Sequence, residues 1–307
     1  MSDTPDISSM QGLRIWLQAP VAASTGQARA QAFWRGWLRL LANKAAFAGL
    51  VVLIALVLCA IFGPYLTPYN AMSQDLDIRL LAPSGAHLLG TDDLGRDILT
   101  RILYGARITL MMAALVAIIA GPTGLIVGAT AGYLGGWADI VAMRVVDIFL
   151  SFPSLILALA FVAALGPGIE NAVIAISLSA WPPIARLARA EALTVRNSDY
   201  IAAARIQGAS NWRLILRHVM PVCLPSVVIR ITLNMAGIIL TAAGLGFLGL
   251  GAQPPSPEWG AMLASGRQFM LTSWWLAAAP GAAIMLVSLA FNLLGDGLRD
   301  VLDPRDD

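Results

Sequence analysis

The feature that most constrains this chain is a series of apolar stretches, each about long enough to cross a lipid bilayer. A helix needs roughly 20 apolar residues to span the hydrocarbon core, and it satisfies its backbone hydrogen bonds within one segment. The stretches cover residues 45–62, 108–133, 148–165, 171–185, 221–250 and 274–294. Pro182 and Pro183 predict a kink near the end of the fourth. The pattern predicts an all-α, polytopic membrane protein with about six transmembrane helices.

The composition excludes several other classes of protein. Hydrophobic residues make up 58% of the 307 residues and charged residues only 12%, against roughly a quarter in soluble domains. A net charge of +2 with a single lysine, Lys44, argues against nucleic-acid binding. Cys59 and Cys223 lie in or beside apolar stretches, and His87 and His218 are far apart in the sequence. A disulfide framework, a Cys/His metal site or a bound cofactor is therefore not expected.

The basic residues predict the orientation of the chain. If the N-terminus is cytosolic, most arginines fall on the cytosolic side, and the other side keeps Arg79, Arg96, Arg101, Arg107 and Arg267. Because cytosolic loops carry an excess of basic residues, both termini are expected to be cytoplasmic.

Three parts are expected along the chain. Residues 1–30 are polar and lack a sustained period, which indicates a flexible cytosolic tail. Residues 31–107 are expected to hold an interfacial helix, the first transmembrane helix and an outer loop. Residues 108–307 are expected to form a core domain with five transmembrane helices and a cytosolic loop at 186–220.

The interfacial helix is one of two interpretations of the segment before the first span. Apolar side chains recur at helical spacing on one face, with arginines opposite, in the set Phe33, Trp37, Leu40, Leu41, Arg35 and Arg39. Such a helix suits the membrane interface. The segment could equally be the cytosolic start of the first transmembrane helix.

The cytosolic loop contains the signals of a short helix. Asn197 or Ser198 can cap its N-terminus, and Gly208 is placed to end it. Asp199 in the first turn and Arg205 in the last turn complement the helix dipole.

A second helix is expected to follow at a glycine corner. Ser210 can cap it, and it is expected to run to Pro221. Small side chains at Ala202, Ala203 and Ala204 allow the first helix to approach another surface closely.

With these signals, the chain resembles the inner-membrane permease subunits of bacterial ABC importers. Their cytoplasmic loop carries Glu-Ala-Ala, three residues, Gly, nine residues, Ile, one residue and Leu-Pro, and the matching positions are Ala203, Ala204, Gly208 and Pro221. The chain departs from this pattern at Ala202, His218 and Met220. More specific matches to the dipeptide/oligopeptide/nickel subfamily are Leu89-Gly90-Thr91-Asp92, Leu94-Gly95-Arg96-Asp97, Gly105-Ala106-Arg107, Gly246-Phe247-Leu248-Gly249-Leu250-Gly251, Pro257-Glu258-Trp259-Gly260, Asn292-Leu293-Leu294-Gly295-Asp296-Gly297-Leu298-Arg299-Asp300 and Asp303-Pro304-Arg305.

The resemblance, which covers the chain from about residue 32 onward, implies a C-type permease with the type I ABC importer permease fold. It implies four kinds of partner: a homologous permease, two ATPase subunits, an extracytoplasmic substrate-binding protein and the lipid bilayer of the bacterial inner membrane. The residues expected to couple to the ATPase are Asp199, Tyr200, Ala203, Ala204, Arg205, Gly208, Ala209 and Ser210. Short peptides are the expected cargo, and a nickel chelate, glutathione or another small solute is the alternative.

ATP hydrolysis by this chain is not expected. A P-loop needs Gly-Lys followed by Ser or Thr, and Lys44 follows Asn43. An enzyme within the membrane is disfavoured because both histidines fall outside the spans. A secondary transporter or channel working without an ATPase is the alternative function. It is disfavoured because no pair of acidic residues is expected inside a span.

Two sets of charged residues each have two interpretations. Arg230 lies within the fifth apolar stretch, and it could either snorkel to the cytosolic interface or line a translocation path with Asn234, one turn further on. In the outer loop, Asp92, Asp93, Arg96 and Asp97 form either a docking surface or an internally paired loop.

Overall fold

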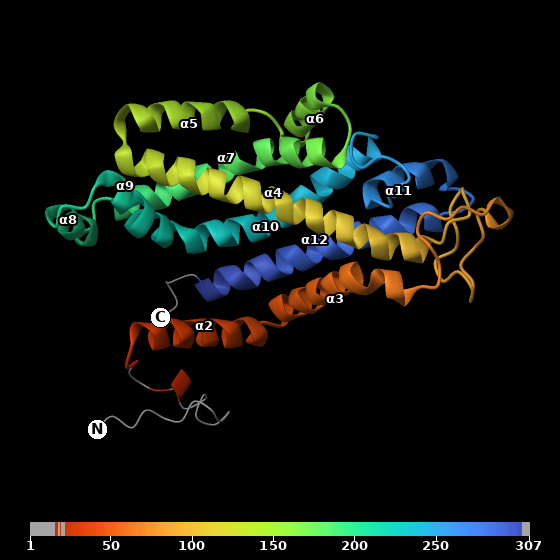
Figure 1. The fold of residues 1–307 in the computed structure, drawn as a ribbon, viewed down its shortest axis with the longest axis horizontal. Helices are drawn as coiled ribbons and strands as arrows, with labels where there is room; N and C mark the ends of the chain where they lie inside the picture. Colours follow the sequence, from red (N-terminus) through yellow and green to blue (C-terminus); the bar gives the residue numbers. More distant parts are fainter. Residues whose placement is uncertain (1–15, 18, 20–21, 303–307) are drawn as a thin grey trace.

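The computed structural model describes residues 16, 17, 19 and 22–302, and these residues form helices and loops without a β-strand. The main helices are α2 (Thr25–Ala42), α3 (Lys44–Leu66), α4 (Ile98–Leu134), α5 (Gly136–Leu150), α6 (Ser154–Leu165), α7 (Ile169–Val195), α8 (Asp199–Ile206), α9 (Asn211–Leu214), α10 (Met220–Phe247), α11 (Trp259–Gly266) and α12 (Trp275–Leu302). Short turns are η1 (Leu76–Ile78), the π-helical η2 (Ile215–Val219) and η3 (Arg267–Phe269). Figure 1 shows an elongated bundle, with α8 and α9 at one end and α11 at the other.

Within the described residues, four helical segments are long and apolar enough to cross a membrane. They are Lys44–Gly63, Ile98–Leu134, Asn211–Phe247 and Trp275–Val301, and the bent pair α5 and α6 would make a fifth. The remaining predicted span lies in α7, which is more polar. Because α7 packs against α4, α5, α6 and α10, it is shielded by other helices and needs less apolar surface of its own.

The span predicted at residues 148–165 is not one continuous helix, so that prediction was wrong. α5 and α6 are separated by a short break and are bent by 92° relative to each other. Pro153 lies in this break and accounts for it. Proline has no backbone N–H, and its ring disfavours the helical conformation of the residue before it, here Phe152.

α7 runs beyond the predicted stretch of 171–185 and continues to Val195, with Pro182 and Pro183 inside the helix. Residues 186–195 are therefore helical, and the loop predicted at 186–220 begins only after Val195. Arg186 and Arg189 fall within the predicted loop, but both lie on α7 and pair with aspartates of α5.

α4 also starts earlier than predicted, at Ile98 rather than near residue 108. Asp97 caps it, because its Oδ2 accepts hydrogen bonds from the Thr100 N–H at 2.8 Å and from the Thr100 hydroxyl at 2.7 Å. Arg101 and Arg107 lie in the first turns. Because these charges lower the hydropathy of the first turns, the apolar pattern predicted the start of α4 too late.

Small residues let α4 and α7 pack closely against each other along much of their length. A Cβ atom added at Gly124 would lie 2.7 Å from the Ile184 Cβ, and one at Gly132 would lie 2.7 Å from the Arg189 carbonyl oxygen. At Gly128 it would overlap the carbonyl oxygen of Ala185. These glycines recur every four residues, so they lie on one face of α4 and let the two backbones meet.

α2 and α3 are separate helices, which excludes α2 as a continuous start of the first span. Asn43 breaks the chain between them, and its Oδ1 caps α3 by accepting from the N–H groups of Ala45 and Ala46. Figure 1 shows α2 reaching past α3 toward the α8 end of the bundle. Its location in the membrane interface stays a prediction.

α2 also shortens the tail predicted at residues 1–30. The helix begins at Thr25, where Ser24 accepts a hydrogen bond from the Gln27 N–H at 3.1 Å. Residues 1–15, 18, 20 and 21 of this tail lie outside the described residues, as do residues 303–307.

We expect Gly128→Ala to destabilise the fold by about 1–3 kcal/mol, because the new methyl group forces α4 and α7 apart. Gly281→Ala is the matched control, since its Cβ would lie 3.8 Å from Leu263 Cδ1, an ordinary contact. Thermal unfolding of the purified proteins in detergent measures the difference. Equal stability of the two variants would show that the α4–α7 contact does not require a glycine.

Candidate functional site

The corner formed by α8 and α9 has the caps that the sequence predicts. Ser198, rather than Asn197, caps α8 by accepting from the Ile201 N–H at 3.5 Å. Gly208 ends it with a φ of +82°, and its N–H donates to the Arg205 carbonyl at 3.0 Å. A residue with a Cβ rarely adopts this backbone conformation, so glycine is required at the corner by geometry.

The helix that begins after Ser210 does not end at Pro221, contrary to the prediction. Ser210 accepts from the Arg213 N–H at 3.4 Å, and α9 then passes through η2 into α10. η2 is π-helical, with the Met220 N–H bonded to the Ile215 carbonyl. Pro221 cannot donate to the preceding turn, and the wider π turn leaves room for its ring.

The α8–α9 corner is anchored by buried apolar side chains. Ile201 of α8 is 0% exposed, and Leu214 and Val219 are also buried. They belong to one apolar cluster with Ala188 and Ala192 of α7. The corner is therefore packed against the bundle and is not a free loop.

Two polar contacts add to this anchor. The Arg205 guanidinium donates to the hydroxyl of Tyr133, near the end of α4, at 3.0 Å. The Tyr200 hydroxyl lies 2.5 Å from Nδ1 of His218 in η2. α8 is thereby joined to both α4 and the turn that leads into α10.

The outward side of the corner is apolar as well as polar. Ile206 is 88% exposed and Trp212 61% exposed, and Tyr200 and Leu216 are more than half exposed. Of the residues predicted to couple to an ATPase, six are exposed and two, Ala204 and Ala209, are half-buried; the exposed ones are Asp199, Tyr200, Ala203, Arg205, Gly208 and Ser210. The corner thus offers a surface suited to another protein.

Arg230 and Asn234 lie on α10, far along the chain from the corner. Arg230 is exposed and Asn234 half-exposed. Among the described residues, Arg230 forms no ion pair. One further turn along, a Cβ added at Gly237 would meet no atom within 4 Å, so this face of α10 is open.

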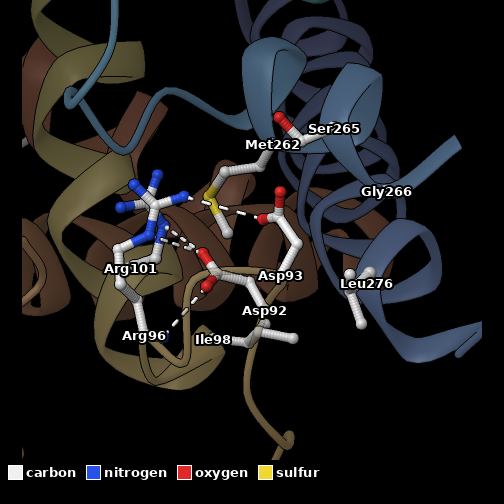
Figure 2. Close-up of a pocket in the computed structure, with 9 residues that line it drawn as sticks. All are labelled: Asp92, Asp93, Arg96, Ile98, Arg101, Met262, Ser265, Gly266 and Leu276. Atoms are coloured by element: carbon white, nitrogen blue, oxygen red, sulfur yellow. Dashed lines mark hydrogen bonds and ion pairs between the residues drawn. The ribbon is translucent and has the colours of Figure 1, made fainter. Parts of the chain in front are cut away.

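At the opposite end of the bundle, the charged residues of the outer loop pair with one another. Asp92 accepts from the Arg96 side chain at 2.7 Å and lies 3.5 Å from Arg101 Nε. Figure 2 shows these groups around a cavity of about 20 Å³, also lined by Met262 and Leu276. Asp92, Arg96 and Arg101 are all buried. The interpretation as an internally paired loop therefore fits, and a docking surface made of these side chains does not.

Glu258 of the Pro-Glu-Trp-Gly motif has a structural role that the motif alone does not reveal. Its carboxylate caps α11 by accepting from the N–H groups of Gly260 and Ala261, both at 2.8 Å. Burial raises the pKa of Glu258, and these two hydrogen bonds oppose the shift. A Cβ at Gly246 would overlap this carboxylate, so the two motifs fit against each other.

Two ion pairs between α5 and α7 were also missed. Arg189 of α7 donates from Nε and Nη2 to the two carboxylate oxygens of Asp139 of α5, and Arg186 Nη2 lies 2.5 Å from Asp147 Oδ1. Two acidic residues thus do lie in the bent candidate span, contrary to the prediction that no span holds such a pair. The sequence signal for these ion pairs was the presence of opposite charges on two neighbouring helices, at spacings that let them meet.

The family described as "Binding-protein-dependent transport system inner membrane component" matches residues 124–306, more than half of the chain. The chain belongs to this family. Residues 31–83 match the "N-terminal TM domain of oligopeptide transport permease C". The resemblance inferred from the sequence is confirmed: the chain is a transport permease of the ABC importer class, not an enzyme, and a multi-pass membrane protein.

Several curated relatives are similar over most of their length. A probable D,D-dipeptide transport permease of Escherichia coli is 48% identical over 83% of this chain and 86% of its own. A di/tripeptide transport permease of Pseudomonas aeruginosa is 45% identical, covering 89% and 91%. A glutathione transport permease of Pectobacterium atrosepticum is 45% identical, covering 89% and 90%.

A solved structure shows the same fold. The methionine ABC transporter MetNI, in an inward-facing conformation, matches 66% of this chain and 96% of its own with a TM-score of 0.53 and 21% identity. The type I ABC importer permease fold predicted from the sequence is thereby confirmed.

We expect Arg96→Gln to lower the stability of the permease by about 1–3 kcal/mol, because the buried Asp92 carboxylate loses its charged donor. Arg79→Gln is the matched control, since Arg79 is exposed in the same loop. Thermal unfolding in detergent and proteolysis of the outer loop report the change. A stability loss no larger than that of the control would mean that the network is not stabilising.

Proposed function

We propose that ATPase subunits drive this permease by binding the corner made by α8, Gly208 and α9. The observation that carries the proposal is the combination of a firm anchor and an exposed face. Buried Ile201 and the Arg205–Tyr133 hydrogen bond fasten the corner to the bundle, while Ile206 and Trp212 project outward. A rigid handle of this kind can transmit a movement to the spans. The coupling residues are those predicted from the sequence, from Asp199 to Ser210.

We propose that the working assembly contains this chain, a homologous permease, two ATPase subunits and an extracytoplasmic substrate-binding protein. The chain has no Gly-Lys-Ser/Thr sequence, so the energy of ATP must come from a partner. In this arrangement both termini are cytoplasmic, the corner faces the cytosol, and the network around Asp92 faces the outside of the inner membrane.

We propose that the cargo is a short peptide. The names of the relatives mention dipeptides, tripeptides and glutathione, which share amide bonds and free charged ends. Arg230 and Asn234 would line the path that the cargo follows. An unpaired arginine facing lipid costs several kcal/mol, whereas one facing an aqueous path keeps its hydration. Mass spectrometry of ligand bound to the cognate binding protein tests the cargo, and a non-peptide ligand would contradict it.

The orientation predicts which sites a membrane-impermeant thiol reagent reaches. In a variant lacking Cys59 and Cys223, a cysteine replacing Gln207 should react only from the cytosolic side, and one replacing Gly85 only from outside. Both positions are exposed, so access depends on the side alone. Labelling of right-side-out and inside-out vesicles measures this. Reaction of the Gln207→Cys variant only from outside would overturn the proposed orientation.

Gly208→Val is expected to weaken coupling without preventing folding. A Cβ there meets no atom within 4 Å, so the substitution acts through the backbone, at a cost of roughly 1–2 kcal/mol in the left-handed region. We expect assembly with the partner permease to persist, while ATPase association falls or hydrolysis no longer drives uptake. Co-purification of the subunits, with hydrolysis and uptake in proteoliposomes, measures these steps.

Gly85→Val is the matched control. Its Cβ also meets nothing within 4 Å, but its φ lies outside the left-handed region, and it lies in the outer loop. Wild-type association, hydrolysis and uptake in Gly208→Val would sink the assignment of the corner as the coupling element.

A further inference from the structure

Glu191 of α7 and Arg230 of α10 are opposite charges that share Ser226 of α10 as a neighbour, one bonded to its hydroxyl and the other one helical turn further along the helix. The Glu191 Oε1 accepts a hydrogen bond from the Ser226 hydroxyl at 2.8 Å. Ser226 is four residues, or one turn, before Arg230 on the same face of α10. Within the described part of the chain, neither Glu191 nor Arg230 has an oppositely charged group within 4.0 Å.

The antiparallel arrangement of α7 and α10 makes the Glu191 and Arg230 side chains lean in opposite directions along the bundle. The Cys223 thiol lies 3.7 Å from the Ala188 carbonyl, and the Gly168 N–H bonds to the Leu250 carbonyl, so α7 and α10 run antiparallel. Side chains on a helix lean toward its N-terminus. Glu191 and Arg230 therefore lean from opposite directions toward the turn that carries Ser226.

This face of the bundle is unsuited to lipid. Ser226, Arg230 and Asn234 follow one another at four-residue spacing, and Gly237 adds open space beyond them. The arginines of the neighbouring helix α7, Arg186 and Arg189, are each paired with an aspartate. Arg230 alone of these three is left without such a partner among the described residues, which indicates that its partner is supplied from outside the chain.

We infer that Glu191 and Arg230 together bind the two charged ends of a zwitterionic short peptide. Arg230 pairs with the peptide carboxylate, Glu191 pairs with the peptide ammonium group, and the Ser226 hydroxyl holds the Glu191 carboxylate in place. Glu191 is bonded to Ser226, and Arg230 follows Ser226 by one helical turn, a rise of about 5.4 Å. Two extended residues span at most about 7 Å, so the charged ends of a dipeptide can reach groups held one turn apart. This inference rests on the proposed function, in which Arg230 lines the path.

The test measures binding to the assembled importer without its substrate-binding protein, so that the selectivity of that protein does not enter. Saturation-transfer difference NMR of the complex in nanodiscs, without ATP, reports weak binding of dialanine, N-acetyl-dialanine and dialanine amide. The wild type should bind dialanine about tenfold more tightly than either blocked peptide, since each block removes one charge-assisted contact.

The variants should divide according to the blocked end. Arg230→Gln should bind dialanine no better than the wild type binds dialanine amide, and Glu191→Gln no better than the wild type binds N-acetyl-dialanine. Arg230→Lys keeps the charge and should stay within about threefold of the wild type. Glu170→Gln, in the first turn of α7, and Arg79→Gln are the matched controls and should leave binding unchanged.

Two results would overturn the inference. One is equal binding of dialanine by the wild type, Glu191→Gln and Arg230→Gln. The other concerns the charge-swapped double variant Glu191→Arg/Arg230→Glu. If this variant takes up peptide like the wild type but does not bind dialanine, the two groups pair directly with each other. Either result leaves the proposed function standing as long as ATP still drives uptake, because the coupling corner is tested separately.

Discussion

The close contact of α4 and α7 is the interaction on which the rest of the structure depends. α7 carries too many polar and charged groups to face lipid alone, and it is accommodated because glycines of α4 let its backbone come near. Alanines lie opposite two of these glycines, Ala188 opposite Gly128 and Ala192 opposite Gly132. Only three residues lie between the end of α7 and the start of α8, so the position of α7 constrains that of α8. It also brings Arg189 to Asp139 of α5. A bulky residue between α4 and α7 would displace both the α8–α9 corner and the Arg189–Asp139 ion pair.

Charges inside the bundle fall into two groups that differ in their partners. Arg186 and Arg189 each have an aspartate on a neighbouring helix, so their role is satisfied within the chain. At the other end of the bundle, Asp92 likewise pairs with buried charged residues of this chain, Arg96 and Arg101. Glu191 and Arg230 differ, since the first has only a hydroxyl donor and the second lies open. Removing charged groups from water is costly unless they are paired, so an open pair in a polytopic bundle marks a surface that meets water, cargo or another subunit.

The sequence predicted the class of fold and the caps of the α8–α9 corner better than it predicted the helix boundaries. Caps are local chemistry, and Ser198, Gly208 and Ser210 therefore act where they were expected. Hydropathy reports only contact with lipid, so it failed where a helix is covered by other helices, as along residues 186–195. It also could not show that Pro153 breaks a helix while Pro182 and Pro183 do not. That outcome depends on tertiary packing. The pairing of Glu191 with Ser226 joins residues 35 apart and has no local signal.

The contacts of the α8–α9 corner indicate how a displacement of the corner would reach the proposed path at Arg230. Arg205 of α8 donates a hydrogen bond to Tyr133 of α4, and glycines of α4 pack closely against α7. These three helices should therefore move as one body. α9 enters α10 through the π turn η2, which lacks a regular α-helical hydrogen-bond ladder. This turn interrupts the regular α-helix between the corner and α10. A displacement of the corner should therefore move α4 and α7 relative to α10. Glu191 lies on one side of that boundary and Arg230 on the other, so the same movement changes the distance between the two charges and would release a peptide held by both.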